Sequence, residues 1–425
     1  MSRPSTAYKA SRGDWIASLR ESPVFCHLTE DQLRGLILDG RLHRFTDGDE
    51  IIHAEDPTCS AFLVVEGACE VESATEATFL MAPTLVGEVA VLTGTPRTST
   101  VRAVGHVEAI VIERDRFLAA IRTSAAAGQA LTELVADRIC APDSVREVGR
   151  FAVEDIIGEG GSGRVLRARH PLLDVPIALK MLSHARALMP EGPREFISEA
   201  RLLFDLDHPR MVRVLDVFEA HRTFFIVMPW IDGDSLRHRL DDGARLTRDQ
   251  IFAVAEQTLD ALGALHRGGI VHRDIKPSNL LIDSTGKVML IDFGIACKIE
   301  SSQSSVRRLV GSPAYCSPEQ ILSRPVDGRA DVYSLGCTLY ELVFGLPPFG
   351  ETEIEAVIEG HLRGTPSWDM ADAVPMGDDF MRWLRRCLSR TRATRYDAAA
   401  ALDALRGIAG AAKTLQLRSE TESAE

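Results

Sequence analysis

The chain of 425 residues carries 48 lysines and arginines against 61 aspartates and glutamates, which gives a formal net charge of −13. This acidic balance argues against a nucleic-acid partner, which normally needs a basic protein face. No apolar run is long enough to span a membrane, and Met1–Ser5 do not lead into the apolar segment of a secretion signal.

The eight cysteines include no C-x-x-C pair. This spacing predicts reduced, mostly structural thiols, and we therefore expect a cytoplasmic protein. The length is sufficient for about three domain-sized units.

The first region, which we expect to form a domain over residues 16–140, has short apolar runs punctuated by glycine. Such spacing predicts a small antiparallel β-barrel or jelly roll. Helical patterns at Thr29–Leu38 and Arg114–Ile139 flank it on both sides. The apolar runs are Glu50–Ile52, Ala61–Val65, Cys69–Val71 and Val107–Ile112.

Within this region, the segment Val86–Val101 reads V-G-E-V-A-V-L-T-G-T-P-R-T-S-T-V. It is similar to the phosphate-binding cassette of cyclic nucleotide-binding domains. The resemblance implies that Glu88 accepts the ribose 2′-hydroxyl, that Arg97 binds the cyclic phosphate, and that Gly87 contributes a backbone amide. Thr98 is also expected at this site and leaves open whether the ligand is cyclic AMP or cyclic GMP. A barrel that has lost its ligand is the alternative.

After a linker predicted at residues 141–150, glycines at positions 158, 160 and 163 form a G-x-G-x-x-G pattern that Val165 follows. Glycine lets backbone amides approach phosphate groups because no Cβ stands in the way. The next apolar run, Ile177–Lys180, predicts a strand that carries Lys180. A helix expected over Arg194–Leu206 presents Glu199.

The segment Ile226–Ile231 contains Met228 followed by Pro229, which has no backbone N–H to donate. If this segment binds a base, the contacts would fall to the Pro229 carbonyl and to the backbone of Ile231. The residues that we expect around the nucleotide are Ile157, Gly158, Gly160, Gly163, Val165, Ala178, Lys180, Met228 and Ile231.

The most informative segment reads H-R-D-I-K-P-S-N from His272 to Asn279, and D-F-G follows from Asp292. Asp274 can accept the proton of a substrate hydroxyl, and Lys276 can reach a phosphate that is being transferred. Asn279 and Asp292 offer hard oxygen ligands suited to Mg²⁺, with Mn²⁺ as an alternative.

Taken in order, the glycine pattern, the strand lysine, the helix glutamate, H-R-D and D-F-G resemble the motifs of protein kinases. The resemblance implies a bilobal α+β domain over residues 151–410, with ATP and Mg²⁺ as cofactors and proteins as substrates. It assigns catalytic roles to Asp274, Lys276, Lys180 and Glu199, the last two as an ion pair. Lys276 and Gly311-Ser312 imply specificity for serine and threonine.

The same resemblance implies supporting roles for residues outside the reaction centre. Ser312 is expected to bond near Asp274 and Lys276. Glu319 should form an ion pair with Arg395, and Asp331 should hold the catalytic-loop backbone.

Arg273 next to Asp274 is typical of kinases that are ordered by phosphorylation, because the arginine needs an anion to face. Ser304 and Ser305 are the candidate phosphorylation sites, and a serine-rich loop that carries no phosphate is the alternative. The polar tail over residues 411–425 is predicted to be disordered.

The sequence thus predicts a multidomain protein in which a cyclic nucleotide-binding barrel precedes a serine/threonine kinase, resembling the cyclic-GMP-dependent protein kinases in architecture. One alternative is an active kinase whose barrel only mediates protein contacts. A pseudokinase scaffold is a second alternative, against which the four residues Lys180, Asp274, Asn279 and Asp292 argue. The protein substrate, the sign of regulation and the oligomeric state stay open.

Overall fold

The computed structural model describes residues 12–38, 40–54, 56, 60–72, 77–94, 97, 99–140, 146–160, 163–204, 206–292, 297–298, 312–350, 353–368 and 374–422. The chain divides into two compact units: unit 1 is Met1–Ser198 with Leu215–Met228, and unit 2 is Glu199–Val214 with Pro229–Glu425. In the described part of the chain, no helix combines the length and the apolar character that a membrane crossing requires.

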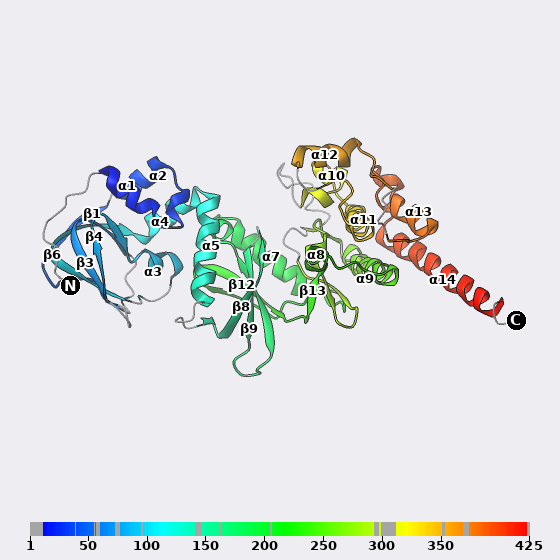
Figure 1. The fold of residues 1–425 in the computed structure, drawn as a ribbon, viewed down its shortest axis with the longest axis horizontal. Helices are drawn as coiled ribbons and strands as arrows, with labels where there is room; N and C mark the ends of the chain where they lie inside the picture. The colour runs from blue at the N-terminus through cyan, green and yellow to red at the C-terminus, as the bar shows by residue number, and fades with distance from the viewer. Residues whose placement is uncertain are drawn as a thin grey trace. The chain divides into compact units, whose positions relative to one another are not determined.

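Unit 1 begins with helical pieces and a first sheet (Figure 1). The strands pair in the order β1-β6-β3-β4, with β2 on β6 and β5 on β3. Apolar side chains that include Ile52, Val64 and Val107 form its buried core. The elements are α1 (Arg12–Arg20), η1 (Phe25–His27), α2 (Glu30–Leu38), β1 (Arg41–Phe45), β2 (Glu50–Ile52), β3 (Ser60–Glu72), β4 (Ala77–Met81), β5 (Thr84–Val86), α3 (Glu88–Thr93), β6 (Thr100–Glu113), α4 (Arg114–Arg122) and α5 (Ala125–Cys140).

These elements confirm the expected antiparallel β-rich domain with flanking helices. The single helical pattern predicted over Arg114–Ile139 is two helices. The first ends in a turn in which the Thr123 amide donates to the Ala120 carbonyl at 3.1 Å, and the Ser124 hydroxyl accepts from the Ala127 amide at the start of the second. A hydroxyl at a helix start satisfies an amide that the helix itself cannot.

A second sheet completes unit 1, with the strand order β11-β12-β10-β9-β8-β7. Strand β9 alternates buried and half-buried positions, so that Leu166 and Ala168 point into the core. The elements are β7 (Glu147–Val148), β8 (Phe151–Gly160), β9 (Gly163–Arg169), β10 (Pro176–Leu182), α6 (His184–Ala187), α7 (Gly192–Phe204), which crosses into unit 2, β11 (Asp216–Ala220) and β12 (Thr223–Pro229).

One hydrophobic core joins the first helices to the second sheet. Leu131 and Val135 of α5 belong to the same cluster of buried residues as Phe151 of β8, Leu166 of β9 and Met181 of β10. Because a shared apolar core is lost only when both partners separate, α5 is part of the folded body that carries the second sheet.

Unit 2 is mainly helical (Figure 1). Helix α11 is buried from Ala330 to Phe344, and α9 starts at a capping box formed by Thr247 and Gln250. The elements are β13 (Gly233–Ser235), α8 (Leu236–Asp241), α9 (Arg248–Arg267), β14 (Ile270–Val271), η2 (Pro277–Asn279), β15 (Leu280–Asp283), β16 (Val288–Leu290), β17 (Cys297–Lys298), η4 (Pro313–Tyr315), α10 (Pro318–Ile321), α11 (Arg329–Phe344), α12 (Ile354–Arg363), α13 (Asp378–Cys387), η5 (Arg392–Thr394) and α14 (Ala398–Glu422).

Helix α14 runs to Glu422, where the sequence predicted a disordered tail from residue 411. Although the tail is polar, it contains residues of high helix propensity, since alanine, leucine, lysine and glutamate occur there without proline. A helix that is already formed adds residues at little cost, because only the first turn is expensive to nucleate.

Candidate active site

The glycine pattern and Lys180 are aligned across three adjacent strands of unit 1. Val165 at the start of β9 pairs with Gly158 on β8 and with Lys180 on β10. Gly160 and Gly163 are paired at the end of the β8–β9 hairpin. The structure therefore brings the predicted phosphate loop next to the predicted lysine.

At Gly163, the backbone conformation and the close packing exclude any residue with a side chain. Its φ is 144°, and a Cβ built at this position would lie 1.8 Å from the Met181 carbonyl oxygen. Gly158, in contrast, has 3.6 Å of room before the nearest atom of Val165. The tight glycine is thus the one that brings β9 against β10, the strand of Lys180.

The other residues predicted around the nucleotide fall in both units. In unit 1, Ala178, Lys180 and Met228 are buried, and Ile157 is 42% exposed. In unit 2, Ile231 is half-buried and Glu199 is buried. Because Lys180 and Glu199 belong to different units, their ion pair stays a prediction.

Asp274, Lys276 and Asn279 form a compact polar cluster in unit 2. The Lys276 ammonium lies 2.8 Å from Asp274 Oδ2. Asn279 Nδ2 donates to the Asp274 backbone carbonyl at 2.8 Å and to its Oδ2 at 3.2 Å. The three side chains come from one loop because η2 turns the chain back on itself between Pro277 and Asn279.

Ser312 joins this cluster from a distant part of the chain. The Lys276 ammonium donates to Ser312 Oγ at 2.7 Å, and the Ser312 amide donates to Asp274 Oδ1 at 3.1 Å. This confirms the expected contact of Ser312 with Asp274 and Lys276. The Asp274 carboxylate is held from both sides, which fixes its direction without displacing it from the loop.

Asn279 and Asp292 fit the ligand set of a magnesium ion. The Ile291 amide donates to the Asn279 carbonyl at 3.1 Å, so Asp292 follows directly beside Asn279. The amide nitrogen of Asn279 bonds to Asp274, which directs the amide oxygen elsewhere. An amide oxygen and a carboxylate are hard ligands of the kind that Mg²⁺ takes with phosphate oxygens. Phe293 and Gly294 lie outside the described residues.

Asp331, at the start of α11, holds the loop backbone as expected. Its Oδ2 accepts from the His272 amide at 2.9 Å and from His266 Nε2 at 2.8 Å, and its Oδ1 accepts from the Arg273 amide at 2.7 Å. Burial alone would raise the pKa of Asp331, but the hydrogen bond and charge of His266, together with His272, hold that pKa below its ordinary value.

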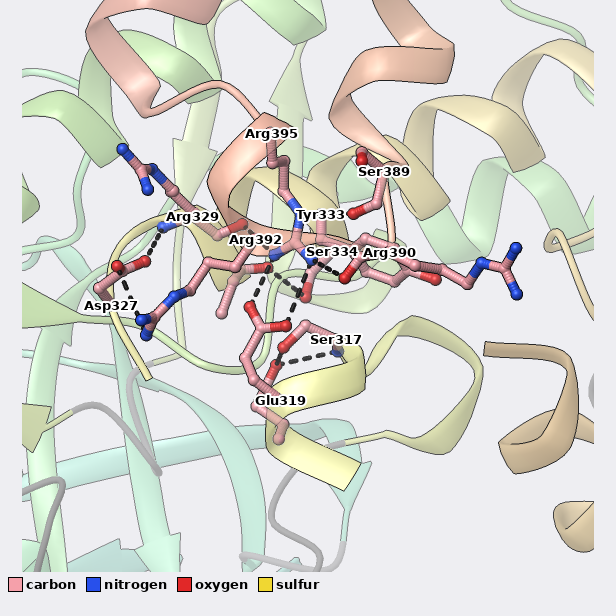
Figure 2. A network of polar contacts seen from close by, with 12 residues as sticks. Ser317, Glu319, Asp327, Arg329, Tyr333, Ser334, Ser389, Arg390, Arg392 and Arg395 are labelled. Atoms are coloured by element: carbon pink, nitrogen blue, oxygen red, sulfur yellow. Dashed lines mark hydrogen bonds and ion pairs between the residues drawn. The ribbon is translucent and has the colours of Figure 1, made fainter. Parts of the chain in front are cut away.

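Glu319 and Arg395 form the ion pair that the sequence predicted (Figure 2). Arg395 Nη1 lies 2.6 Å from Glu319 Oε1, and Nη2 lies 3.2 Å from Oε2, with both side chains buried. Arg395 also donates to the carbonyls of Ser389 and Arg329, and its guanidinium lies over the Tyr333 ring. The pair ties the start of α10 to the segment after α13.

A pocket of about 270 Å³ borders the cluster of Asp274, Lys276 and Asn279, because Ser312 is one of its lining residues. The sequence does not predict this pocket. Helix α12 contributes Ile354 and Val357, and Ser312 with the first two residues of η4 contributes the rest. His361 of the same helix is buried and bonds to the Tyr333 hydroxyl at 2.9 Å. No motif marks α12, so only the fold shows that it reaches the reaction centre. The lining residues are Ser312, Pro313, Ala314, Ile354 and Val357.

In the first sheet of unit 1, the predicted cassette residues also come together. Arg97 is 4% exposed and donates to the carbonyl of Gly87 at 2.7 Å and to that of Ser60. Burial lowers the pKa of Arg97, while the nearby carboxylates of Asp56 and Glu88 oppose this. Gly87 has a φ of 81°, and a Cβ there would lie 2.3 Å from Arg97 Nη1.

These contacts place Gly87, Glu88 and Arg97 at the start of the short helix α3. A helix start with an adjacent guanidinium favours an anion. Thr98 lies outside the described residues, as do Gly161 and Ser162 of the glycine pattern and the phosphorylation candidates Ser304 and Ser305.

Comparisons with known families agree with this organisation. The model of the protein kinase domain family matches residues 151–405. The model of the cyclic nucleotide-binding domain family matches residues 42–124.

Curated relatives resemble part of the chain. Serine/threonine-protein kinase PknB of Mycobacterium tuberculosis (strain ATCC 25618 / H37Rv) is 35% identical over 262 residues, which are 60% of this chain and 42% of the relative. PkaB of Streptomyces coelicolor is 34% identical over 266 residues, 60% of this chain and 62% of PkaB. Serine/threonine-protein kinase 36 of Pongo abelii is 36% identical over 219 residues, 52% of this chain and 16% of the relative. The chain therefore spans less than two thirds of the length of each of these relatives.

Proposed function

Because the chain belongs to the protein kinase family, we propose that it transfers the γ-phosphoryl group of ATP to serine and threonine side chains of proteins. The observation that carries this proposal is the cluster of Asp274, Lys276 and Asn279 with Ser312. A phosphoryl transfer needs an aimed nucleophile and neutralised phosphate charge more than it needs covalent chemistry.

In this proposal, Asp274 accepts the proton of the substrate hydroxyl, and its two oxygens are already directed by Lys276 and by the Ser312 amide. Lys276 then reaches the transferring phosphate. Asn279 and Asp292 would hold Mg²⁺, which supplies charge neutralisation for the ATP phosphates. The pocket lined by Ile354 and Val357 would take an apolar side chain of the protein substrate.

In this proposal, ATP is bound by the strands of unit 1. The β8–β9 hairpin with its glycines would cover the phosphates, and Lys180 would bind them, paired with Glu199. Met228 and Ile231 would border the adenine. The need for ATP supports a cytoplasmic setting.

We further propose that a cyclic nucleotide bound at Gly87, Glu88 and Arg97 regulates the kinase. Arg97 and the start of α3 support this, since Arg97 already donates to two backbone carbonyls there. A cyclic phosphate would replace neutral carbonyls with a charged acceptor, and charge-assisted hydrogen bonds are roughly twice as strong. Glu88 would accept the ribose hydroxyl.

The test is phosphate transfer to a generic protein substrate, with and without cyclic AMP or cyclic GMP. We expect Asp274→Asn to abolish transfer, whereas Asp283→Asn, at the last residue of β15 and outside this cluster, should leave it unchanged. Full activity of Asp274→Asn would overturn the assigned base. For regulation, Arg97→Ala should lose nucleotide binding by calorimetry, with Arg102→Ala on the outer face of the same domain as its control.

The alternative in which the barrel only mediates protein contacts is favoured if the wild-type chain binds neither cyclic nucleotide. The pseudokinase alternative requires that neither an added substrate nor the chain itself is phosphorylated.

A further inference from the structure

Helix α5, the last helix of the nucleotide-binding region, lies directly against the segment that follows the Lys180 strand. A Cβ at Gly128 would lie 2.5 Å from the Ala185 Cα, so only glycine permits this approach. One turn later, Thr132 Oγ1 accepts from the His184 amide at 2.8 Å and lies 3.2 Å from His184 Nδ1. His184 begins α6, which follows β10 with a single residue between.

His184 extends this contact to the β11–β12 hairpin. Its side chain is completely buried, and Nε2 donates to the His221 carbonyl at 2.9 Å. Burial lowers the pKa of His184 to about 4, so the ring is neutral near pH 7 and donates from Nε2 alone. Thr132, His184 and His221 thus form one chain of hydrogen bonds from α5 to the second sheet.

The β11–β12 turn is itself strained. Ala220 pairs with Thr223, which leaves His221 and Arg222 as the two central residues of the turn, with φ values of 48° and 60°. Two-residue hairpin turns of this type favour asparagine and glycine, because positive φ is costly for other residues. Such strain persists where surrounding contacts fix the backbone.

The contacts that hold this turn come from the end of the cassette helix α3 and from β7. Hydrogen bonds of the His221 ring to the backbone of Thr93 and Glu147 oppose the lowering of its pKa by burial. Thr93 is the last residue of α3, and Arg222 Nε lies 3.2 Å from the position of a Cβ on Gly94. The turn therefore touches the far end of the helix whose start carries Glu88.

A third contact reaches the glycine loop. Asp137 of α5 lies 3.7 Å from Arg164 Nη1, and Arg164 directly follows Gly163 in β9. Arg164 is buried, whereas the Asp137 side chain is 68% exposed. Helix α5 is thus linked to both strands that carry the predicted ATP-binding groups, β9 through Arg164 and β10 through His184.

From these three contacts we propose that Thr132, His184, His221 and Asp137 are positioning residues, through which α3 and α5 set the geometry of the ATP-binding strands β9, β10 and β12. This inference rests on the proposed function, because it requires that the cassette binds a cyclic nucleotide. A nucleotide that shifts α3 or α5 would then alter ATP binding directly, because β12 leads to Met228 and β10 carries Lys180.

Linkage gives a test that does not depend on catalysis. If the contacts couple the two sites, ATP and the cyclic nucleotide must change each other's affinity by the same factor. We would titrate the full chain with cyclic AMP and with cyclic GMP by calorimetry, with and without a saturating non-hydrolysable ATP analogue. In the wild-type chain we expect an affinity change of about fivefold or more, the lower end of common allosteric couplings.

Three variants remove one contact each. Thr132→Val removes the hydroxyl that bonds His184 and keeps the shape, and Thr258→Val is its control, a buried threonine of α9 in unit 2. His221→Asn removes the ring, while asparagine tolerates the positive φ. Asp137→Asn acts on an exposed side chain and so does not endanger folding. We expect all three to reduce the coupling factor, and Thr258→Val to keep the wild-type value.

Each outcome decides between the claims. A wild-type chain that binds a cyclic nucleotide without any effect of the ATP analogue would overturn the coupling and leave the proposed sensor intact. Full coupling in all three variants would overturn the positioning role of these residues and would also leave the sensor intact. A wild-type chain that binds neither cyclic nucleotide would overturn the sensor. In that case the affinity for the ATP analogue alone decides: a value in Thr132→Val and Asp137→Asn equal to that of the wild type would overturn the positioning role.

Discussion

The carboxylate of Asp331 holds Arg273 in a left-handed backbone conformation. The Arg273 amide donates to Asp331 Oδ1 at 2.7 Å, and the φ of Arg273 is 70°. The Arg273 carbonyl is fixed from the other side, since it accepts from Gln320 Nε2 at 2.8 Å. A non-glycine residue in this region costs on the order of 1–3 kcal/mol, and it persists only where the surroundings fix it. Here the left-handed conformation of Arg273 orients the next residue, Asp274.

Replacement of Asp331 by asparagine should release this loop. Each carboxylate oxygen faces a backbone amide, so the NH₂ group of an asparagine would meet a donor wherever it points. We expect a loss of about 2 kcal/mol in stability, the cost of a buried unsatisfied donor, and a fall in kcat with little change in the KM for ATP. Thermal unfolding and steady-state kinetics measure the two effects. Asp327→Asn, two residues before α11 and more exposed than Asp331, should leave both near wild type; a wild-type kcat in Asp331→Asn contradicts the positioning role.

Two glycines of the phosphate loop should respond differently to alanine. A Cβ at Gly163 would lie 1.8 Å from the Met181 carbonyl, and φ is 144°. We expect Gly163→Ala to separate β9 from β10, lowering stability by at least ~2 kcal/mol through strain and lost pairing. Gly158→Ala is the matched control, because the nearest atom stands 3.6 Å away. Thermal unfolding of both variants tests this, and equal midpoints would refute it.

His361 should make the stability of the protein fall in mildly acidic solution. Burial lowers the pKa of His361 to about 4 from the ordinary 6.5. The unfolded chain therefore binds the proton first as pH falls. The stabilisation is complete above pH 6.5 and is lost progressively down to about pH 4, by about 3 kcal/mol.

Urea unfolding between pH 4 and pH 7 checks this dependence. The His361→Gln variant should show a flatter profile, because glutamine does not titrate. His43→Gln, at an exposed position of β1, should follow the wild-type profile. Identical slopes for His361→Gln and the wild type would exclude His361 as the source.

Replacement of only one member of the Glu319–Arg395 ion pair should strongly lower the stability of the protein. Glu319→Gln leaves the Arg395 guanidinium buried with a neutral partner, and the loss of one member of a buried pair costs about 3–5 kcal/mol. Glu359→Gln removes an exposed ion pair with Arg363 and should change nothing measurable. The midpoints of thermal unfolding of Glu319→Gln and Glu359→Gln measure this difference. A Glu319→Gln protein as stable as the control would contradict the structural role of the pair.

Much of the candidate site could be predicted because its motifs are local. The spacing from Asp274 to Asn279 fixes their meeting within one loop, and the structure confirms it. The partners Ser312, Asp331 and Arg395 were also predicted, through resemblance. The helix α12 that lines the pocket was not predicted, since apolar residues of a surface helix carry no mark of what they face. The tail that the sequence predicts to be disordered from residue 411 is part of helix α14 as far as Glu422.

The sequence by itself determined which residues carry the chemistry, since motifs such as H-R-D and the cassette are written within a few consecutive positions. Only the tertiary structure decided how α5 meets the second sheet. Thr132 and His184 are 52 residues apart, and a single hydroxyl and a ring give no sequence signal of their contact. Packing depends on the complementarity of two surfaces, here Gly128 against Ala185, and such complementarity exists only after both elements have folded.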